Sequence, residues 1–104
     1  MMRLPPFTYV APRTVADAAR ALAEHGRAAM LVAGGTDLYP NMKRRQFEPQ
    51  VLVGLRGIRE IAGVGGTARE GLTIGATTTL SAVADHAEIA RHFRALATAA
   101  GLVS

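Results

Sequence analysis

The most constraining feature of this chain is a continuous apolar run, Ala29–Ala33, that passes directly into Gly34 and Gly35. An apolar run without alternation is typical of a strand buried in a parallel sheet. Glycine can take a positive φ and lets another backbone or a ligand approach closely. The combination predicts a strand whose carboxyl end opens into a tight loop, and it favours an α/β fold.

Strand and helix patterns alternate on either side of this run. Phe7–Val10 predicts a short strand that ends before Pro12. The next segment predicts a helix that begins at the N-cap Thr14, has Asp17 in a capping-box-like position and stops at Gly26. The apolar stripe expected on this helix comprises Val15, Ala18, Ala19, Leu22 and Ala23.

A second helix and a third strand follow the glycines. Leu38–Arg45 predicts a short helix with Pro40 in its first turn, where proline is tolerated. Val51–Val53 predicts another buried strand. The order strand, helix, strand, helix, strand implies a small parallel sheet with right-handed crossovers. We expect residues 1–60 to form a first subdomain.

The pattern changes in the second part of the chain. Ile61–Val64 and Leu72–Ile74 predict the strands of an antiparallel hairpin. A helical turn over residues 81–85 and a last helix follow, and Gly101 is expected to end that helix. Residues 61–104 are therefore expected to begin a second subdomain. The apolar face of its last helix comprises Ile89, Phe93, Leu96, Ala97 and Ala100.

Composition excludes several kinds of site. The chain of 104 residues contains no cysteine, which excludes disulfides, iron–sulfur clusters and thiolate zinc sites within it. His86 and His92 lack a carboxylate at ligand spacing, so no metal site is expected. No catalytic nucleophile–base pair can be assembled from the sequence either.

Charge and hydropathy constrain partners and compartment. The formal net charge is +4, but the basic run Lys43–Arg45 lacks the interleaved aromatic residues that nucleic-acid binding requires. A solvated helix end is the expected role of this run. The sequence has neither a secretory signal nor an apolar stretch of membrane-spanning length, so we expect a cytoplasmic protein with no membrane span.

The glycine pair that follows the apolar run is the main candidate for a binding site. Consecutive N–H groups of Gly34 and Gly35, together with the start of a helix, can converge on an anion such as a phosphate. The loop follows the carboxyl end of a strand, where open α/β sheets bind ligands. Thr36 can add a hydroxyl donor, and Asp37 is expected to cap the helix or to meet a ribose-type hydroxyl. A turn without a ligand is the alternative.

Gly75–Thr79 is the second candidate, because it again places glycine and hydroxyls just after a strand. Its alternative role is a turn with a threonine or serine N-cap for the next helix. The first loop matches neither G-x-G-x-x-G nor the P-loop pattern, so the common nucleotide motifs are absent from it.

The segment Leu31–Leu38, with the sequence Leu-Val-Ala-Gly-Gly-Thr-Asp-Leu, resembles the FAD-binding medium subunit of molybdenum hydroxylases. This family includes subunits or domains of carbon monoxide dehydrogenase, xanthine dehydrogenase and 4-hydroxybenzoyl-CoA reductase. The resemblance extends over essentially the whole chain. It includes Phe7–Tyr9 upstream and residues 40–43, 51–53 and 74–78 downstream.

The resemblance implies a vanillyl-alcohol-oxidase-like FAD-binding fold and an oxidoreductase role. It also implies that residues 1–60 are a first FAD-binding subdomain and that residues 61–104 are the truncated start of a second one. In that family FAD receives electrons from 2Fe–2S clusters, which drain a molybdopterin centre, and passes them to an acceptor. The implied partners are a molybdenum-binding large subunit and an iron–sulfur small subunit. The implied FAD pyrophosphate contacts are Leu31, Val32, Ala33, Gly34, Gly35, Thr36, Asp37 and Leu38, and the resemblance adds Gly75, Ala76, Thr77, Thr78 and Val103 as site-shaping or flavin-side residues.

The family pattern continues with a Gln-(Ile/Leu)-Arg-Asn stretch and a Thr-(Leu/Ile)-Gly-Gly-Asn loop, a second FAD contact, whereas this sequence ends at Ser104. We therefore expect the chain alone to bind FAD weakly, to be inactive and to self-associate through exposed apolar surface. Two alternatives remain open. One is a truncated module that binds a mononucleotide, and the other is a non-catalytic subunit remnant.

Overall fold

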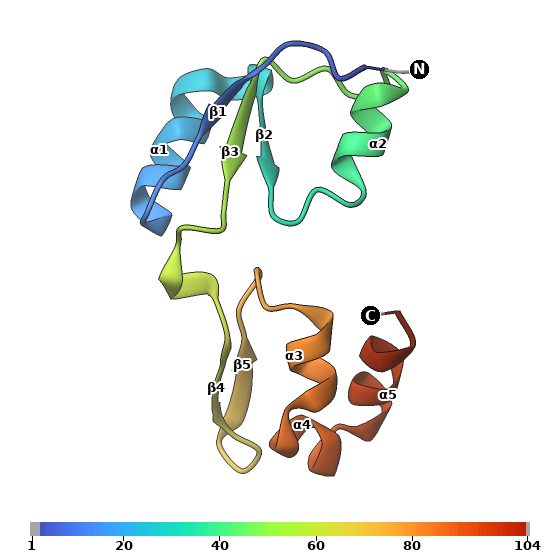
Figure 1. Cartoon of the computed structure of the whole chain (residues 1–104). Coiled ribbons are helices and arrows are strands. Elements are labelled where there is room, and N and C mark those ends of the chain that lie inside the picture. Colours follow the sequence, from blue (N-terminus) through green and yellow to red (C-terminus); the bar gives the residue numbers. More distant parts are fainter. Residues whose placement is uncertain (1–2, 104) are drawn as a thin grey trace. The chain divides into compact units, whose positions relative to one another are not determined.

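The computed structural model describes residues 3–103 and divides into two compact units, Met1–Glu60 and Ile61–Ser104 (Figure 1). The first unit is built on a parallel sheet and the second on an antiparallel hairpin with helices. This order confirms the predicted fold class. The assignment of cofactor-binding subdomains to these units stays a prediction.

A three-stranded parallel sheet forms the centre of the first unit. Its strands are β1 (Thr8–Val10), β2 (Ala29–Val32) and β3 (Val51–Gly54), in the spatial order β1-β3-β2. All four residues of β3 are buried, as its apolar sequence predicts. The prediction of a fully buried strand was wrong for β2, because β2 lies at the edge of the sheet and Leu31 remains 46% exposed.

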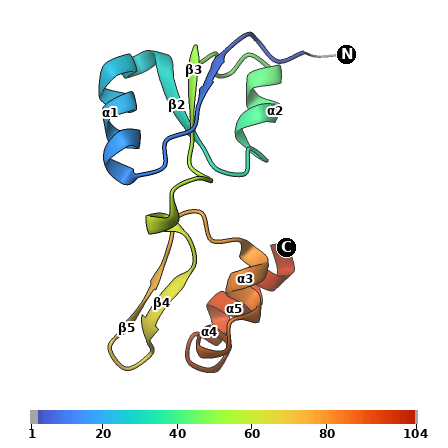
Figure 2. The same cartoon turned by 60° about the vertical axis from the view of Figure 1, so that its left-hand side comes forward.

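Helices cover both faces of this sheet. Figures 1 and 2 both show α1 (Val15–His25) and α2 (Leu38–Lys43) on opposite sides of it. A short 3₁₀ turn, η1 (Gly26–Ala28), joins α1 to β2. On the α2 side, Val32, Met42 and Leu52 form a buried cluster, against which Phe7, Met30, Leu38 and Tyr39 pack.

The face that α1 buries differs from the predicted stripe. Ala18 and Ala21 are buried, whereas Val15 is 43% exposed and Ala19 and Ala23 are exposed. Alanines occur on several sides of this helix, so two stripes of similar spacing compete. Contact with the sheet, which the sequence does not reveal, selects the stripe that contains Ala21.

Helix α2 ends in a Schellman motif with an unusual residue at its left-handed position. The N–H of Arg45 donates to the carbonyl of Met42 (3.0 Å), and the N–H of Gln46 donates to that of Asn41 (2.9 Å). Arg45 has a φ of 64°, although glycine is the usual residue there. The basic run at residues 43–45 therefore marks a helix end, as predicted.

The second unit begins with the last residue of a 3₁₀ turn, η2 (Arg59–Ile61), and contains a hairpin of β4 (Val64–Thr67) and β5 (Gly71–Ile74). The first strand was predicted too early, and Gly65 and Gly66 lie in it rather than in the turn. Thr67 Oγ1 accepts a hydrogen bond from the N–H of Glu70 (3.2 Å), which confines the turn to residues 68–70.

Three helices complete the described part of the second unit: α3 (Leu80–Asp85), α4 (Ala87–His92) and α5 (Arg94–Val103). The prediction of one last helix was wrong, because Phe93 leaves the helical conformation (φ −133°, ψ 55°) and separates α4 from α5. Gly101 does not end α5. It packs against α3, where a Cβ added to it would lie 3.8 Å from that of Ala84.

The core of the second unit is small. Val83, Ile89, Ala97 and Ala100 are buried together, with Val64, Leu72 and Ala84 packed against them.

Within residues 3–103, no helix is both long and apolar enough to cross a bilayer.

Candidate functional site

The loop that joins β2 to α2 leaves the sheet at the carboxyl end of its strands. Because the three strands are parallel, the segments that follow β1, β2 and β3 emerge at the same edge (Figure 1). The N–H of Leu55 donates to the carbonyl of Val32 (2.9 Å), so the loops after β3 and β2 start side by side.

Five consecutive backbone N–H groups in this loop are free to bind a ligand. Within residues 3–103, those of Gly34, Gly35, Thr36, Asp37 and Leu38 have no hydrogen-bond acceptor. The first engaged amide is that of Tyr39, which donates to the carbonyl of Gly35 (3.0 Å). Such a series of unpaired donors is suited to the oxygens of an anion.

The conformation of the chain itself explains why position 35 is a glycine. Its φ is 82°, and a Cβ at this position would overlap the ring of Tyr39. The ring of Tyr39 therefore packs against the loop at Gly35, and Tyr39 also packs against the buried cluster. This contact was not predicted from the sequence. The spacing of four residues between Gly35 and Tyr39 is the only signal that could have indicated it.

No contact within residues 3–103 accounts for Gly34. Its φ is not in the left-handed region, and the nearest atom to an added Cβ, Thr36 Oγ1, would lie at an ordinary 3.7 Å. Apart from this hydroxyl, no atom of the described chain lies within 4 Å of an added Cβ, so the protein itself does not require glycine at position 34. A cofactor diphosphate bound by main-chain amides fits this arrangement.

The expected capping role of Asp37 was wrong. Asp37 occupies the N-cap position of α2 with helical backbone angles (φ −98°, ψ −45°), and in the described chain its side chain makes no capping hydrogen bond. A capping side chain needs extended backbone angles to reach the next amides, so this geometry prevents capping. Since α2 has only six residues, the loop amides rather than a helix dipole are the relevant donors.

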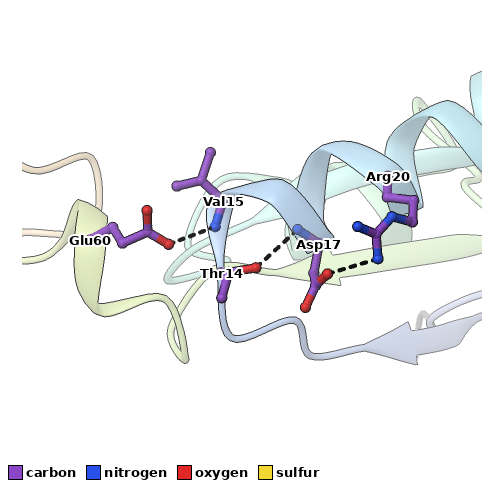
Figure 3. A network of polar contacts seen from close by, with 5 residues as sticks. All are labelled: Thr14, Val15, Asp17, Arg20 and Glu60. Carbon is purple, nitrogen blue, oxygen red and sulfur yellow. Dashed lines mark hydrogen bonds and ion pairs between the residues drawn. The ribbon is translucent and has the colours of Figure 1, made fainter.

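The start of α1 lies at the same sheet edge but is already occupied. Figure 3 shows Thr14 Oγ1 accepting from the N–H of Asp17 (3.0 Å) and Glu60 Oε1 accepting from the N–H of Val15 (2.9 Å). The carboxylate of Asp17 pairs with Arg20 (3.0 Å) and so does not complete the predicted capping box. With two carboxylates present, this helix start is unfavourable for a further anion.

The second candidate loop uses its polar groups to hold the fold. Thr77 Oγ1 donates to the carbonyl of Ile61 (3.0 Å), and Thr78 Oγ1 donates to that of Gly63 (2.9 Å). Thr79 caps α3 by accepting from the N–H of Ala82 (3.1 Å), which confirms the N-cap alternative.

Four of the five candidate residues in the second unit nevertheless meet at one site. Gly75, Ala76, Thr78 and Val103 line an open groove of about 410 Å³, whereas Thr77 does not. The rest of its lining is apolar and comes from β5, α3 and α5: Ile74, Leu80, Val83, Leu96, Ala99 and Ala100. The groove therefore suits an apolar group rather than a phosphate.

The structure corrects one expectation about the histidines. His92 Nε2 lies 3.5 Å from Glu88 Oε2, one helical turn away, so His92 does have a carboxylate nearby. Within the described chain, no three His, Cys, Asp or Glu side chains come together to hold a metal ion.

Comparison with known sequences places the chain among flavin-binding domains. The model of the FAD-binding domain in molybdopterin dehydrogenase matches residues 5–104. The chain is 35% identical over 102 residues to the carbon monoxide dehydrogenase medium chain of Hydrogenophaga pseudoflava, with 96% of this chain and 34% of the relative covered. The corresponding chain of Afipia carboxidovorans is 39% identical over 77 residues, covering 74% of this chain and 26% of the relative.

Solved structures of related enzymes have the same fold as this chain. A cyanide-inactivated Cu,Mo-CO dehydrogenase matches with a TM-score of 0.90 and 34% identity, over 97% of this chain and 35% of that one. Quinoline 2-oxidoreductase from Pseudomonas putida 86 matches with a TM-score of 0.86 and 29% identity, over 95% and 34% of the respective chains. The chain thus spans about a third of the length of these relatives. The resemblance seen in the sequence is confirmed, and the chain belongs to the family of FAD-binding domains in molybdopterin dehydrogenases.

Proposed function

We propose that this chain contributes the diphosphate-binding loop of the flavoprotein component of a molybdenum hydroxylase-type oxidoreductase. The loop Ala33–Asp37 would hold the FAD pyrophosphate through the amides from Gly34 to Leu38, and Leu31 and Val32 would anchor it to the sheet. The observation that carries this proposal is the series of unpaired amides beside Gly34, a glycine that neither its φ nor any close contact in the described chain requires.

FAD, when bound, supplies the redox chemistry by accepting electrons from iron–sulfur clusters and passing them to an acceptor. The residues of this chain bind and orient the cofactor, and none is proposed as a catalytic acid or base. Tyr39 holds the loop in the shape in which its amides are exposed, because its ring packs where a side chain at position 35 would lie.

The groove of the second unit is proposed to contact the apolar part of the flavin. Its support is the apolar lining and the presence there of Gly75, Ala76, Thr78 and Val103. Thr77 would keep the rim of this groove in place through its hydrogen bond to Ile61.

The partners proposed are a molybdenum-binding large subunit and an iron–sulfur small subunit. Their support is that the relatives are medium chains of carbon monoxide dehydrogenase, and that a matching structure is a Cu,Mo enzyme. Co-purification of the chain with candidate subunits from the same genome tests this part of the proposal.

The diphosphate proposal is tested by a Gly34→Ala substitution, since alanine fits the backbone there but adds a methyl group beside the unpaired amides. We expect about tenfold or greater loss of FAD affinity in a flavin fluorescence titration, because about one charge-assisted hydrogen bond is blocked. Gly65→Ala is the matched control: like Gly34, Gly65 has no positive φ and can take a Cβ without a close contact, but it lies in the hairpin.

Unchanged FAD affinity in the Gly34→Ala chain would contradict the proposed loop contact, as would an equal loss in the Gly65→Ala control. Binding of AMP as tightly as FAD would favour the alternative of a mononucleotide module.

A further inference from the structure

A diphosphate bound at the loop would lack a positive partner within the loop itself. The one ionisable side chain between Ala33 and Leu38 is Asp37, which is negatively charged. Neutral amides bind phosphate oxygens, but a cation makes shorter and stronger charge-assisted hydrogen bonds. A basic residue from a neighbouring segment would offset both the ligand charge and that of Asp37.

The sheet topology restricts the choice of that residue. Arg27 precedes β2 and therefore lies at the amino ends of the strands, away from the loop. The basic run at residues 43–45 lies at the far end of α2. Arg45 is also engaged, with the carbonyl of Arg3 (3.1 Å) and with Glu48 (3.5 Å). Arg13 after β1 and two residues after β3, Arg56 and Arg59, remain at the carboxyl ends of the strands.

Arg56 is the nearest of these three to the loop, because it follows β3 by two residues whereas Arg59 follows it by five. β3 pairs directly with β2, whereas β1 lies on the other side of β3. Arg56 lies in a turn closed by the N–H of Ile58 and the carbonyl of Leu55 (3.1 Å). The amide of Leu55 is itself bonded to Val32, two residues before Gly34, so this turn starts next to the loop.

The side chain of Arg56 is available for a ligand. It is exposed and, among residues 3–103, forms no hydrogen bond or ion pair. Its guanidinium can donate two parallel hydrogen bonds to phosphate oxygens, which an ammonium cannot do.

We propose that Arg56 is the cationic residue that binds the diphosphate over the Gly34–Leu38 amides. The inference rests on the proposed function of the loop and adds a recognition residue to it. It predicts that an anion with two linked phosphates is bound jointly by segments that follow two adjacent strands.

Inorganic pyrophosphate is the probe, followed by the ¹H–¹⁵N signals of Gly34–Leu38 in the full chain. We expect R56Q to bind pyrophosphate about tenfold more weakly than the original chain, and with a smaller dependence on salt. R56K keeps the charge but loses the planar fork, so its loss is smaller. R13Q, the matched control at the same sheet edge, keeps the original affinity, and unchanged signals elsewhere report an intact fold.

The possible failures are distinct. Equal affinity of R56Q and the original chain, or an equal loss in R13Q, would overturn the role of Arg56. An absence of pyrophosphate-induced shifts at Gly34–Leu38 would overturn the joint site. Pyrophosphate binding that depends on Arg56, in a chain that does not bind FAD, would support the role of Arg56 and refute FAD as the ligand.

Discussion

Two adjacent glycines in the candidate loop differ in what the fold requires of them. Gly35 has a positive φ and packs against Tyr39, so the fold itself excludes a side chain there. Gly34 has neither constraint within residues 3–103. A single sequence cannot separate these cases, because Gly-Gly is compatible with a simple turn and with a ligand cradle alike.

This difference predicts opposite effects on stability. Gly35→Ala should lower the free energy of unfolding of the first unit by at least about 1 kcal/mol, because alanine is strained at a positive φ and would overlap Tyr39. Gly34→Ala should change it by less than about 0.5 kcal/mol. Urea denaturation followed by circular dichroism measures both.

The double variant Gly35→Ala/Tyr39→Ala separates the two contributions to this cost. Part of the loss caused by Gly35→Ala should be absent when the ring is already missing, and the φ strain should remain. Equal stability of the two single glycine variants would contradict this account of Gly35.

The position of the candidate loop could be predicted from the sequence, but the details of its geometry could not. The apolar run followed by Gly34 and Gly35 indicates a strand end and a loop. The expected cap at Asp37 failed because its backbone adopts helical angles, and Tyr39 was missed because its contact with Gly35 depends on how α2 packs.

At the scale of elements, the first amide of α1 donates a hydrogen bond to a carboxylate that is distant in the sequence. Glu60 lies in η2, and its side chain accepts a hydrogen bond from the first amide of the helix, that of Val15 (2.9 Å) (Figure 3). The contact joins residues 45 positions apart in the chain and places a negative charge at the positive end of a helix.

Glu60→Ala should therefore destabilise α1 by about 0.5–1 kcal/mol, the usual cost of losing a helix N-terminal acceptor at an exposed site. Thermal unfolding of the first unit, followed by the amide signals of α1, measures this loss. Glu70→Ala is the control, because Glu70 contributes only its backbone N–H to the hairpin turn. If both variants unfold at the same temperature, the contact of Glu60 contributes nothing to stability.

The types of the elements follow from local sequence more reliably than their limits do. Thr14 and Gly26 mark both ends of α1 because capping is a local interaction. The break at Phe93 and the continuation of α5 through Gly101 depend instead on packing between α3, α4 and α5. Tertiary contacts override propensity at such positions, and no short window of sequence contains them.

At the scale of the whole molecule, each unit has its own small core, and the second unit exposes much apolar surface. Its exposed large side chains include Ile74, Leu80, Phe93, Leu96, Leu102 and Val103, with Leu102 83% exposed. Apolar surface of this kind favours association.

We therefore expect the weight-average mass of the chain in sedimentation equilibrium to rise with concentration, and Leu96→Gln to reduce this rise. Leu31→Gln is the matched control, because Leu31 on β2 is 46% exposed and Leu96 is 45% exposed. A monomer at all concentrations, or an equal effect of the two substitutions, would contradict association through the second unit.

The contrast between positions 34 and 35 also bears on how this protein can evolve. Under the proposed role of Gly34, a lineage that no longer used the ligand would be free to replace this glycine, because folding does not select for it, whereas Gly35 would persist as long as the first unit still folded. Substitutions at position 34 in a lineage that retained Gly35 would therefore record the loss of the ligand, even where the fold is fully preserved.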